Sequence, residues 1–157
     1  MTVAEVDIVI VNRVDDKATV ANRDDATNQS DVATQTNSGA IVLIASDGNL
    51  TITDGGDGDA VGVAANGAGN ILLESVLADV IVNAGVQSEN GNISVLGHGN
   101  VTQGSTGNVN VTVGTGTIDV EAVTGAITMS DGAQATTVDA NIRYQAKTDL
   151  ALSLIHI

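Results

Sequence analysis

The residues of this chain best suited to bind a metal are three aspartates in one glycine-rich turn. Asp54, Asp57 and Asp59 lie within residues 54–59, with glycines between them. Calcium prefers several hard oxygen ligands, which carboxylates on such a turn could supply. The segment is similar to a Gly-Gly-x-Gly-x-Asp calcium motif, but Ala60 stands at the motif's aspartate position and the motif occurs once. Two hypotheses stay open: a weak calcium site at these aspartates, and a solvated acidic turn, which the single copy favours.

Other polar residues offer less chemistry. Asp119 and Glu121 are two residues apart in an alternating stretch, so both side chains point to one side of a strand. Paired carboxylates can hydrolyse glycosides. Without a basic or aromatic partner nearby in the sequence, however, we interpret them as a solvated acidic strip. His98, between two glycines, is interpreted as a surface corner residue. A last polar cluster, assigned to surface packing, consists of Arg143, Tyr144 and Lys147.

The charge of the chain excludes several classes of function. Its 157 residues carry a net charge of −14, and no lysine or arginine lies between Asp24 and Ile142. Nucleic-acid binding needs a basic surface, and an anionic membrane would repel this one. We therefore predict no nucleic-acid partner and no membrane insertion. The absence of cysteine excludes a disulfide scaffold, a thiol nucleophile and a thiolate zinc site.

These residues are set in a chain that repeats a short phrase: glycine, a small polar residue, then an aliphatic residue that opens an alternating strand. The phrase begins at Gly48, Gly69, Gly91, Gly99 and Gly107, with looser copies at Gly39, Gly116 and Gly125. One turn-plus-strand unit is too small to bury its own apolar face, so successive units must stack. Taking two phrases as one coil, the spacing predicts coils of about 19–22 residues.

The fold class follows from this repeat. Residues 109–113 alternate strictly between valine and polar residues, which is typical of a half-buried strand. Aromatic residues make up 1% of the chain and proline is absent, which suits a narrow aliphatic bore with continuous backbone ladders. We predict an all-β fold: a single-stranded β-solenoid, built as a right-handed parallel β-helix of seven or eight coils. Glycines should supply positive φ at the corners, and asparagines should form ladders between coils.

The chain divides into three parts. We expect residues 1–38 to be a degenerate or partly disordered N-terminal coil or loop region, because they are polar and lack the phrase. Residues 39–150 are the β-solenoid repeats. Residues 151–157 are expected to be a truncation or an artefactual tail, since the end of the chain resembles translated sequencing-adapter sequence. No secretory signal precedes the repeats, so we expect an internal piece of a longer protein.

The repeats also carry a family resemblance. Its residues are 79–84, 91–95, 116–122, 125–132 and 141–144. Together they resemble the repeat region of giant bacterial surface proteins, the filamentous-haemagglutinin-like and RTX-type adhesins with β-solenoid stalks. The resemblance covers residues 39–150. It implies a secreted or surface-anchored β-helix that serves as stalk or adhesive fibre, and it implies no catalytic residues.

We therefore expect a non-enzymatic structural or adhesive stalk segment, without a cofactor, at the bacterial cell surface or outside the cell. Its partners would be neighbouring coils of a longer parent chain and a host or matrix surface. One alternative is a calcium-binding repeat module centred on Asp54, Asp57 and Asp59. Another is a fragment of a β-helical carbohydrate-active enzyme. That enzyme would need aspartates beside lysine or arginine on one strip, and the central coils lack basic residues.

Overall fold

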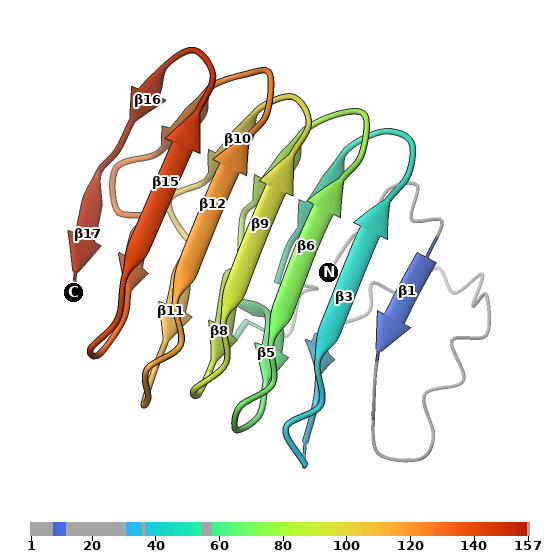
Figure 1. The fold of residues 1–157 in the computed structure, drawn as a ribbon, viewed down its shortest axis with the longest axis vertical. Coiled ribbons are helices and arrows are strands. Elements are labelled where there is room, and N and C mark those ends of the chain that lie inside the picture. The colour runs from blue at the N-terminus through green and yellow to red at the C-terminus, as the bar shows by residue number, and fades with distance from the viewer. Residues whose placement is uncertain (1–7, 12–30, 36, 55–57, 157) are drawn as a thin grey trace.

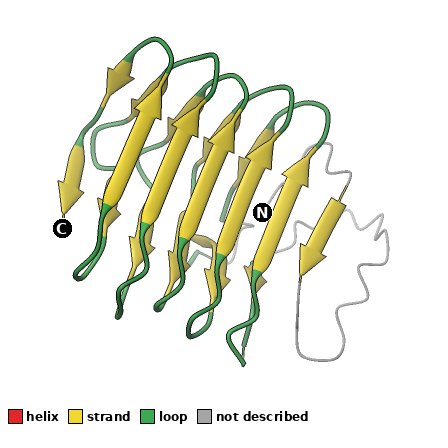
Figure 2. Ribbon diagram, viewed as in Figure 1, coloured by secondary structure: helices red, strands yellow, loops and turns green. Residues whose placement is uncertain are grey.

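The computed structural model describes residues 8–11, 31–35, 37–54 and 58–156. Within these ranges the chain forms strands joined by turns and loops, and no helix (Figure 2). Hence no described segment is a helix that could cross a membrane.

The strands stack side by side into three sheets, and each coil adds one strand to each sheet (Figure 1). Sheet A has the order β1 (Ile8–Val11), β3 (Ile41–Ala45), β6 (Ile71–Ser75), β9 (Ile93–Gly97), β12 (Ile118–Ala122), β15 (Ile142–Ala146). Sheet B has the order β2 (Val32–Ala33), β5 (Val61–Ala65), β8 (Gly85–Ser88), β11 (Val109–Val111), β14 (Gln134–Thr136), β17 (Leu154–His156). Sheet C has the order β4 (Leu50–Ile52), β7 (Val80–Val82), β10 (Val101–Gln103), β13 (Ile127–Met129), β16 (Leu150–Ala151).

The predicted all-β solenoid is confirmed, since neighbouring strands pair in parallel except for β1, which pairs antiparallel with β3. The hand of the coil stays a prediction. The predicted length of about 19–22 residues per coil was too short. The first residues of the sheet A strands from β3 to β15 are 22 to 30 residues apart, and the stack has about four turns instead of seven or eight.

The reason for this error lies in where the glycine phrase occurs. Gly91, Gly99 and Gly107 precede β9, β10 and β11, which belong to three different sheets. Three phrases therefore complete one coil, where two were assumed. The strands β5, β7 and β8 lack the phrase, which lengthens the gaps between its earlier copies.

Aliphatic side chains fill the bore between the sheets. Sheet A places Ile41, Ile71, Ile93 and Ile118 in register, and each is at most 1% exposed. Burying one such side chain stabilises a fold by about 1.5–3 kcal/mol. Because each coil repeats the same inward positions, the core is a continuous column along the rod.

Asparagine ladders join the coils at their corners, as the sequence predicted. The Asn92 backbone amide donates to Asn70 Oδ1 at 2.8 Å, and the Thr117 amide donates to Asn92 Oδ1 at 2.9 Å. At another corner, the Ala126 amide donates to Asn100 Oδ1 at 2.9 Å. Each side chain thus satisfies a backbone donor of the following coil that strand pairing leaves free.

Glycine is needed at the corners mainly because the backbones of successive coils pack closely there, and less because of its freedom to adopt a positive φ. A Cβ on Gly91 would lie 2.0 Å from the Gly69 carbonyl oxygen, and one on Gly116 would lie 2.2 Å from the Gly91 oxygen. Among the phrase glycines, Gly48 alone has a positive φ, of 82°. The prediction that these glycines supply positive φ was therefore wrong for most of them: they leave room for backbone to stack on backbone.

Two buried serines close further corners. The Ser88 hydroxyl donates to the Gly69 carbonyl at 2.8 Å and accepts from the Gly91 amide at 2.9 Å. Ser75 makes the equivalent pair of bonds with the Gly48 carbonyl and the Ala78 amide. Each hydroxyl uses both its donor and its acceptor, so burial leaves no polar atom of these serines unpaired.

Parallel pairing reaches beyond the range 39–150. Strand β2 pairs with β5, and β17 pairs with β14. The division into an N-terminal region at residues 1–38, the repeats and a tail at residues 151–157 stays a prediction.

Candidate functional site

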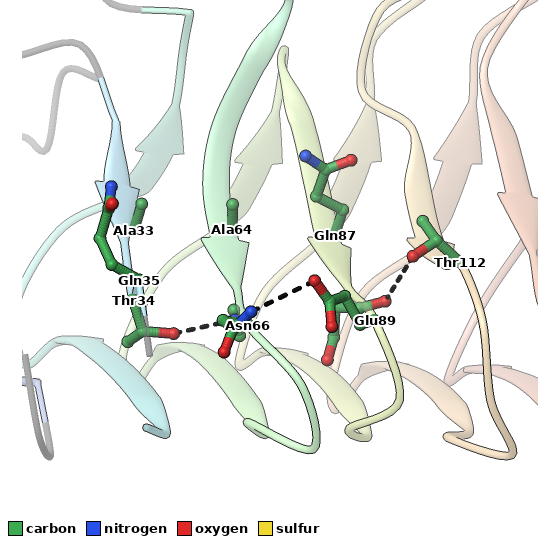
Figure 3. Close-up of a pocket in the computed structure, with 10 residues that line it drawn as sticks. Ala33, Thr34, Gln35, Ala64, Asn66, Gln87, Glu89 and Thr112 are labelled. Atoms are coloured by element: carbon green, nitrogen blue, oxygen red, sulfur yellow. Dashed lines mark hydrogen bonds between the residues drawn. The ribbon is translucent and has the colours of Figure 1, made fainter. Parts of the chain in front are cut away.

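A hollow of about 430 Å³ lies on the outer face of sheet B, across strands β2, β5 and β8 and the segment after β11 (Figure 3). Its volume is within the range of sites for small ligands. The lining residues are Ala33, Thr34, Gln35, Ala64, Ala65, Asn66, Gln87, Ser88, Glu89 and Thr112.

The hollow exists because small and long side chains meet in one outward row. Ala33, Ala64 and Gln87 are in register on β2, β5 and β8. The row continues with Asn110 and Thr136 on the next strands. Two methyl groups beside longer side chains leave space above the sheet, and Figure 3 shows Ala33, Ala64 and Gln87 on neighbouring strands.

Hydrogen bonds between successive coils form one edge of the hollow, and they join the buried Thr34, the partly exposed Asn66 and the exposed Glu89. The Asn66 backbone amide donates to Thr34 Oγ1 at 2.9 Å. The Glu89 carboxylate accepts from Asn66 Nδ2 at 3.2 Å and from the Gly67 amide at 3.0 Å. These two donors, both from the preceding coil, orient a carboxylate whose residue is otherwise exposed.

The lining therefore offers oriented acceptors and free amides. Glu89 is its one ionisable residue. Within the described part of the chain, the side chains of Gln35 and Gln87 make no hydrogen bond with other residues, so each amide can both donate and accept. Such a surface can bind a polar ligand without covalent chemistry.

The aspartate turn is described in part. Asp54 Oδ1 accepts from the Ala60 amide and Asp59 Oδ1 accepts from the Val61 amide, each at 2.8 Å. Asp57 lies outside the described residues. Among residues that are described, no group of three acidic, histidine or cysteine side chains is arranged to hold a metal. The calcium site stays a prediction.

The acidic pair at residues 119 and 121 does have a basic partner, contrary to the sequence interpretation. Arg143 Nε contacts Asp119 Oδ1 at 2.7 Å, and Arg143 Nη2 contacts Glu121 Oε2 at 3.1 Å. The hydrogen bond to Asp119, then its charge and that of Glu121, raise the pKa of the Arg143 guanidinium. Asp119 is paired with Arg143 in the register of β12 and β15, so a correct coil length would have found the contact.

Tyr144 was wrongly assigned to a surface cluster. Its side chain is partly buried, and its hydroxyl donates to Oε1 of Gln103, a residue only 1% exposed. Burial raises the pKa of Tyr144, and the bond to Gln103 opposes this in part. His98 has an exposed side chain at the corner after β9, as predicted.

The sequence analysis did not predict the hollow on sheet B, which is also called the groove from here on. Ala64, Gln87 and Asn110 occupy equivalent positions on successive strands, but a row across coils becomes visible only once the coil has the right length. Their regular spacing of 23 residues is a signal that could have found it.

Comparison with protein-family models, with curated proteins and with solved structures finds no match for this chain. The function must therefore be argued from the fold and from the groove on sheet B.

Proposed function

We propose that this chain is a non-enzymatic structural and adhesive stalk segment of a large secreted or surface-anchored bacterial protein. The observation that carries the proposal is the way each coil is fastened to the next. Strand pairing in three parallel sheets joins successive coils, and asparagine ladders reinforce the two steps that lead from the coil of β6 to that of β9 and on to that of β12. A solenoid of this kind contacts mainly its own neighbours and extends as a rod. The resemblance of residues 39–150 to filamentous-haemagglutinin-like and RTX-type adhesin repeats supports a surface location.

The partner along the rod axis is a neighbouring coil of a longer parent chain. Leu150 is 48% exposed, whereas Ile127, its partner in register on the preceding coil, is fully buried. Ile142 and Tyr144 are likewise more exposed than Ile118 and Val120 at the equivalent positions. A further coil would cover these side chains and gain the apolar burial that each internal coil already has.

The partner at the side of the rod is a host or matrix surface. Outward positions of the strands carry mostly polar or small residues, and the acidic surface keeps such a rod soluble. We propose neither a nucleic-acid partner nor membrane insertion, because the chain carries a net charge of −14.

The location can be tested on the cells that produce the protein. Antibodies raised against the purified chain should label intact cells or detect the protein in the medium, with a cytoplasmic protein as control. Labelling that appears only after the cells are permeabilised would contradict the proposal.

A calcium titration separates the stalk from the calcium-module alternative. We expect the melting temperature of the chain, followed by circular dichroism, to be the same in chelator and in excess calcium. Asp54 and Asp59 already accept backbone hydrogen bonds, so these two carboxylates have partners without an ion. A marked rise in melting temperature with calcium, lost in a D54N/D59N double variant, would favour the calcium module.

A further inference from the structure

We infer that the hollow on sheet B binds an uncharged, hydroxyl-rich saccharide chain that lies along the rod axis, an inference that rests on the proposed adhesive role. The groups of the hollow that would contact the saccharide are the methyl groups of Ala33 and Ala64, the amides of Gln35 and Gln87, and the Glu89 carboxylate. Electrostatics, hydrogen bonding and shape each support this class of ligand.

Charge argues against an anionic ligand. Glu89 is the one ionisable residue of the lining, and no lysine or arginine lies between Asp24 and Ile142. An anion in the hollow would lose part of its hydration, would find no counter-charge among the described lining residues, and would face the Glu89 carboxylate. Phosphates, sulfated glycans and uronic acids are therefore poor ligands, and an uncharged molecule is favoured.

Hydrogen bonding favours hydroxyl groups. The Gly67 amide and Asn66 Nδ2 hold the Glu89 carboxylate in place, but each of its oxygens keeps a lone pair for a ligand. Gln35 and Gln87 can each donate and accept. A sugar hydroxyl also donates and accepts, so it can satisfy both kinds of group within one ring. Ordered polar groups of this kind lower the entropy that binding costs.

The shape of the hollow suits a chain of sugar rings. Ala33 and Ala64 present small apolar patches against which the C–H face of a pyranose ring can pack. The hollow crosses neighbouring strands, which step along the rod by about 4.8 Å, a distance comparable to one hexose unit. Its volume of about 430 Å³ accommodates a short oligosaccharide.

The test uses the whole chain and isothermal titration calorimetry. The probes are cellohexaose, maltohexaose and mannohexaose, with hexagalacturonate as the anionic counterpart. We expect at least one neutral hexasaccharide to bind and hexagalacturonate not to bind. If a folded chain binds none of the neutral probes, or binds hexagalacturonate as tightly, the inference is wrong.

Two variants locate the binding. Ala64→Gln places in the hollow the side chain that the following strand already carries at that register, so it should fold while blocking the site. Gln87→Ala removes the free amide. We expect each to weaken binding by about tenfold or more, which corresponds to about 1.4 kcal/mol. The control Thr128→Gln puts the same side chain on an exposed position of sheet C and should bind as the wild type does.

The outcomes distinguish this inference from the proposed function. Melting curves of all variants show whether the rod is intact. Unchanged binding in an intact Ala64→Gln variant would overturn the sheet B site, while surface labelling of cells would still support the stalk. Binding that is lost in Ala64→Gln but accompanied by a cytoplasmic location would support the groove and overturn the adhesive stalk.

Discussion

Single side chains hold the corners of this solenoid by replacing water as partners of the backbone. Asn92 accepts from the Thr117 backbone amide and also, at 3.1 Å, from the Thr117 hydroxyl. Tyr144 reaches inward to Gln103, whose amide nitrogen donates to the Gly107 carbonyl at 2.8 Å. The contacts of Asn92 with Thr117 and of Tyr144 with Gln103 link residues far apart in sequence, so their removal should weaken the attachment of one coil to another.

The asparagine ladder can be tested at one column of the stack. Asn92→Ala removes the acceptor of the Thr117 amide, and we expect the free energy of unfolding to fall by about 1 kcal/mol. Asn141→Ala is the matched control: Asn141 precedes β15 as Thr117 precedes β12, and its side chain makes no hydrogen bond to the described residues. Urea unfolding should therefore separate the two variants. Equal losses would show that the ladder adds nothing.

The buried phenol of Tyr144 should make the free energy of unfolding depend on pH. Its phenol stays neutral in the folded chain but ionises in the unfolded chain near its ordinary pKa of 10.0, because burial raises the folded pKa. The unfolded state then binds fewer protons, so stability is fully present below pH 10 and falls as pH rises above it, by about 1.4 kcal/mol per pH unit.

Tyr144→Phe isolates this effect because Tyr144 is the only tyrosine in the chain. At neutral pH the variant should lose about 1–3 kcal/mol, since the buried Gln103 oxygen loses its donor. Above pH 10 its stability should fall less steeply than that of the wild type. Parallel urea-unfolding profiles from pH 8 to pH 11 would contradict the buried phenol.

Strands and corners are the elements of this fold, and the corners fix how closely coils approach. The column of Gly69, Gly91 and Gly116 stacks backbone on backbone, with no space for a Cβ atom. Neither a neighbouring carbonyl nor its peptide can move aside without disturbing the coils on both sides. Close packing, more than turn conformation, therefore explains why glycine recurs before strands.

Gly91→Ala tests this explanation by comparison with Gly132→Ala, a change at a glycine that has a positive φ but space for a Cβ atom. Its Cβ would lie 2.0 Å from backbone oxygen, so we expect a loss of about 3 kcal/mol or more. Gly132 has a φ of 90° but its Cβ would meet nothing closer than 3.5 Å. Gly132→Ala should therefore cost only the dihedral strain, about 1–2 kcal/mol. Thermal melts that rank the two variants in the opposite order would contradict the account.

The sequence predicts these elements better than it predicts their arrangement. Alternation in residues 109–113 predicts the strand found as β11 (Val109–Val111). Strands β7 and β8 lack a glycine phrase, and other residues form their corners, such as the Ala84–Gly85 step into β8. The phrase alone therefore does not show how many strands make one coil, and taking two phrases per coil instead of three gave coils that were too short. The contact between Asp119 and Arg143 was then missed for the same reason.

The whole molecule is a stack in which every internal coil is covered on both sides. Its last described coil leaves Leu150 and Leu152 at 48% and 38% exposure, which a further coil would reduce. The groove on sheet B is also a property of the stack, because its residues come from successive coils and no single coil contains it. Rod and groove therefore depend on the same coil-to-coil register.

Adding a coil tests the central claim most directly. A second copy of residues 117–140, inserted between Ala140 and Asn141, supplies one strand to each sheet and repeats the corner positions. Small-angle X-ray scattering of the monomeric protein should show a rod longer by about 4.8 Å with an unchanged cross-section. An insert of the same composition in scrambled order is the control. If the true copy broadens the particle or unfolds as the scrambled insert does, the chain is not a stalk built from stacked coils.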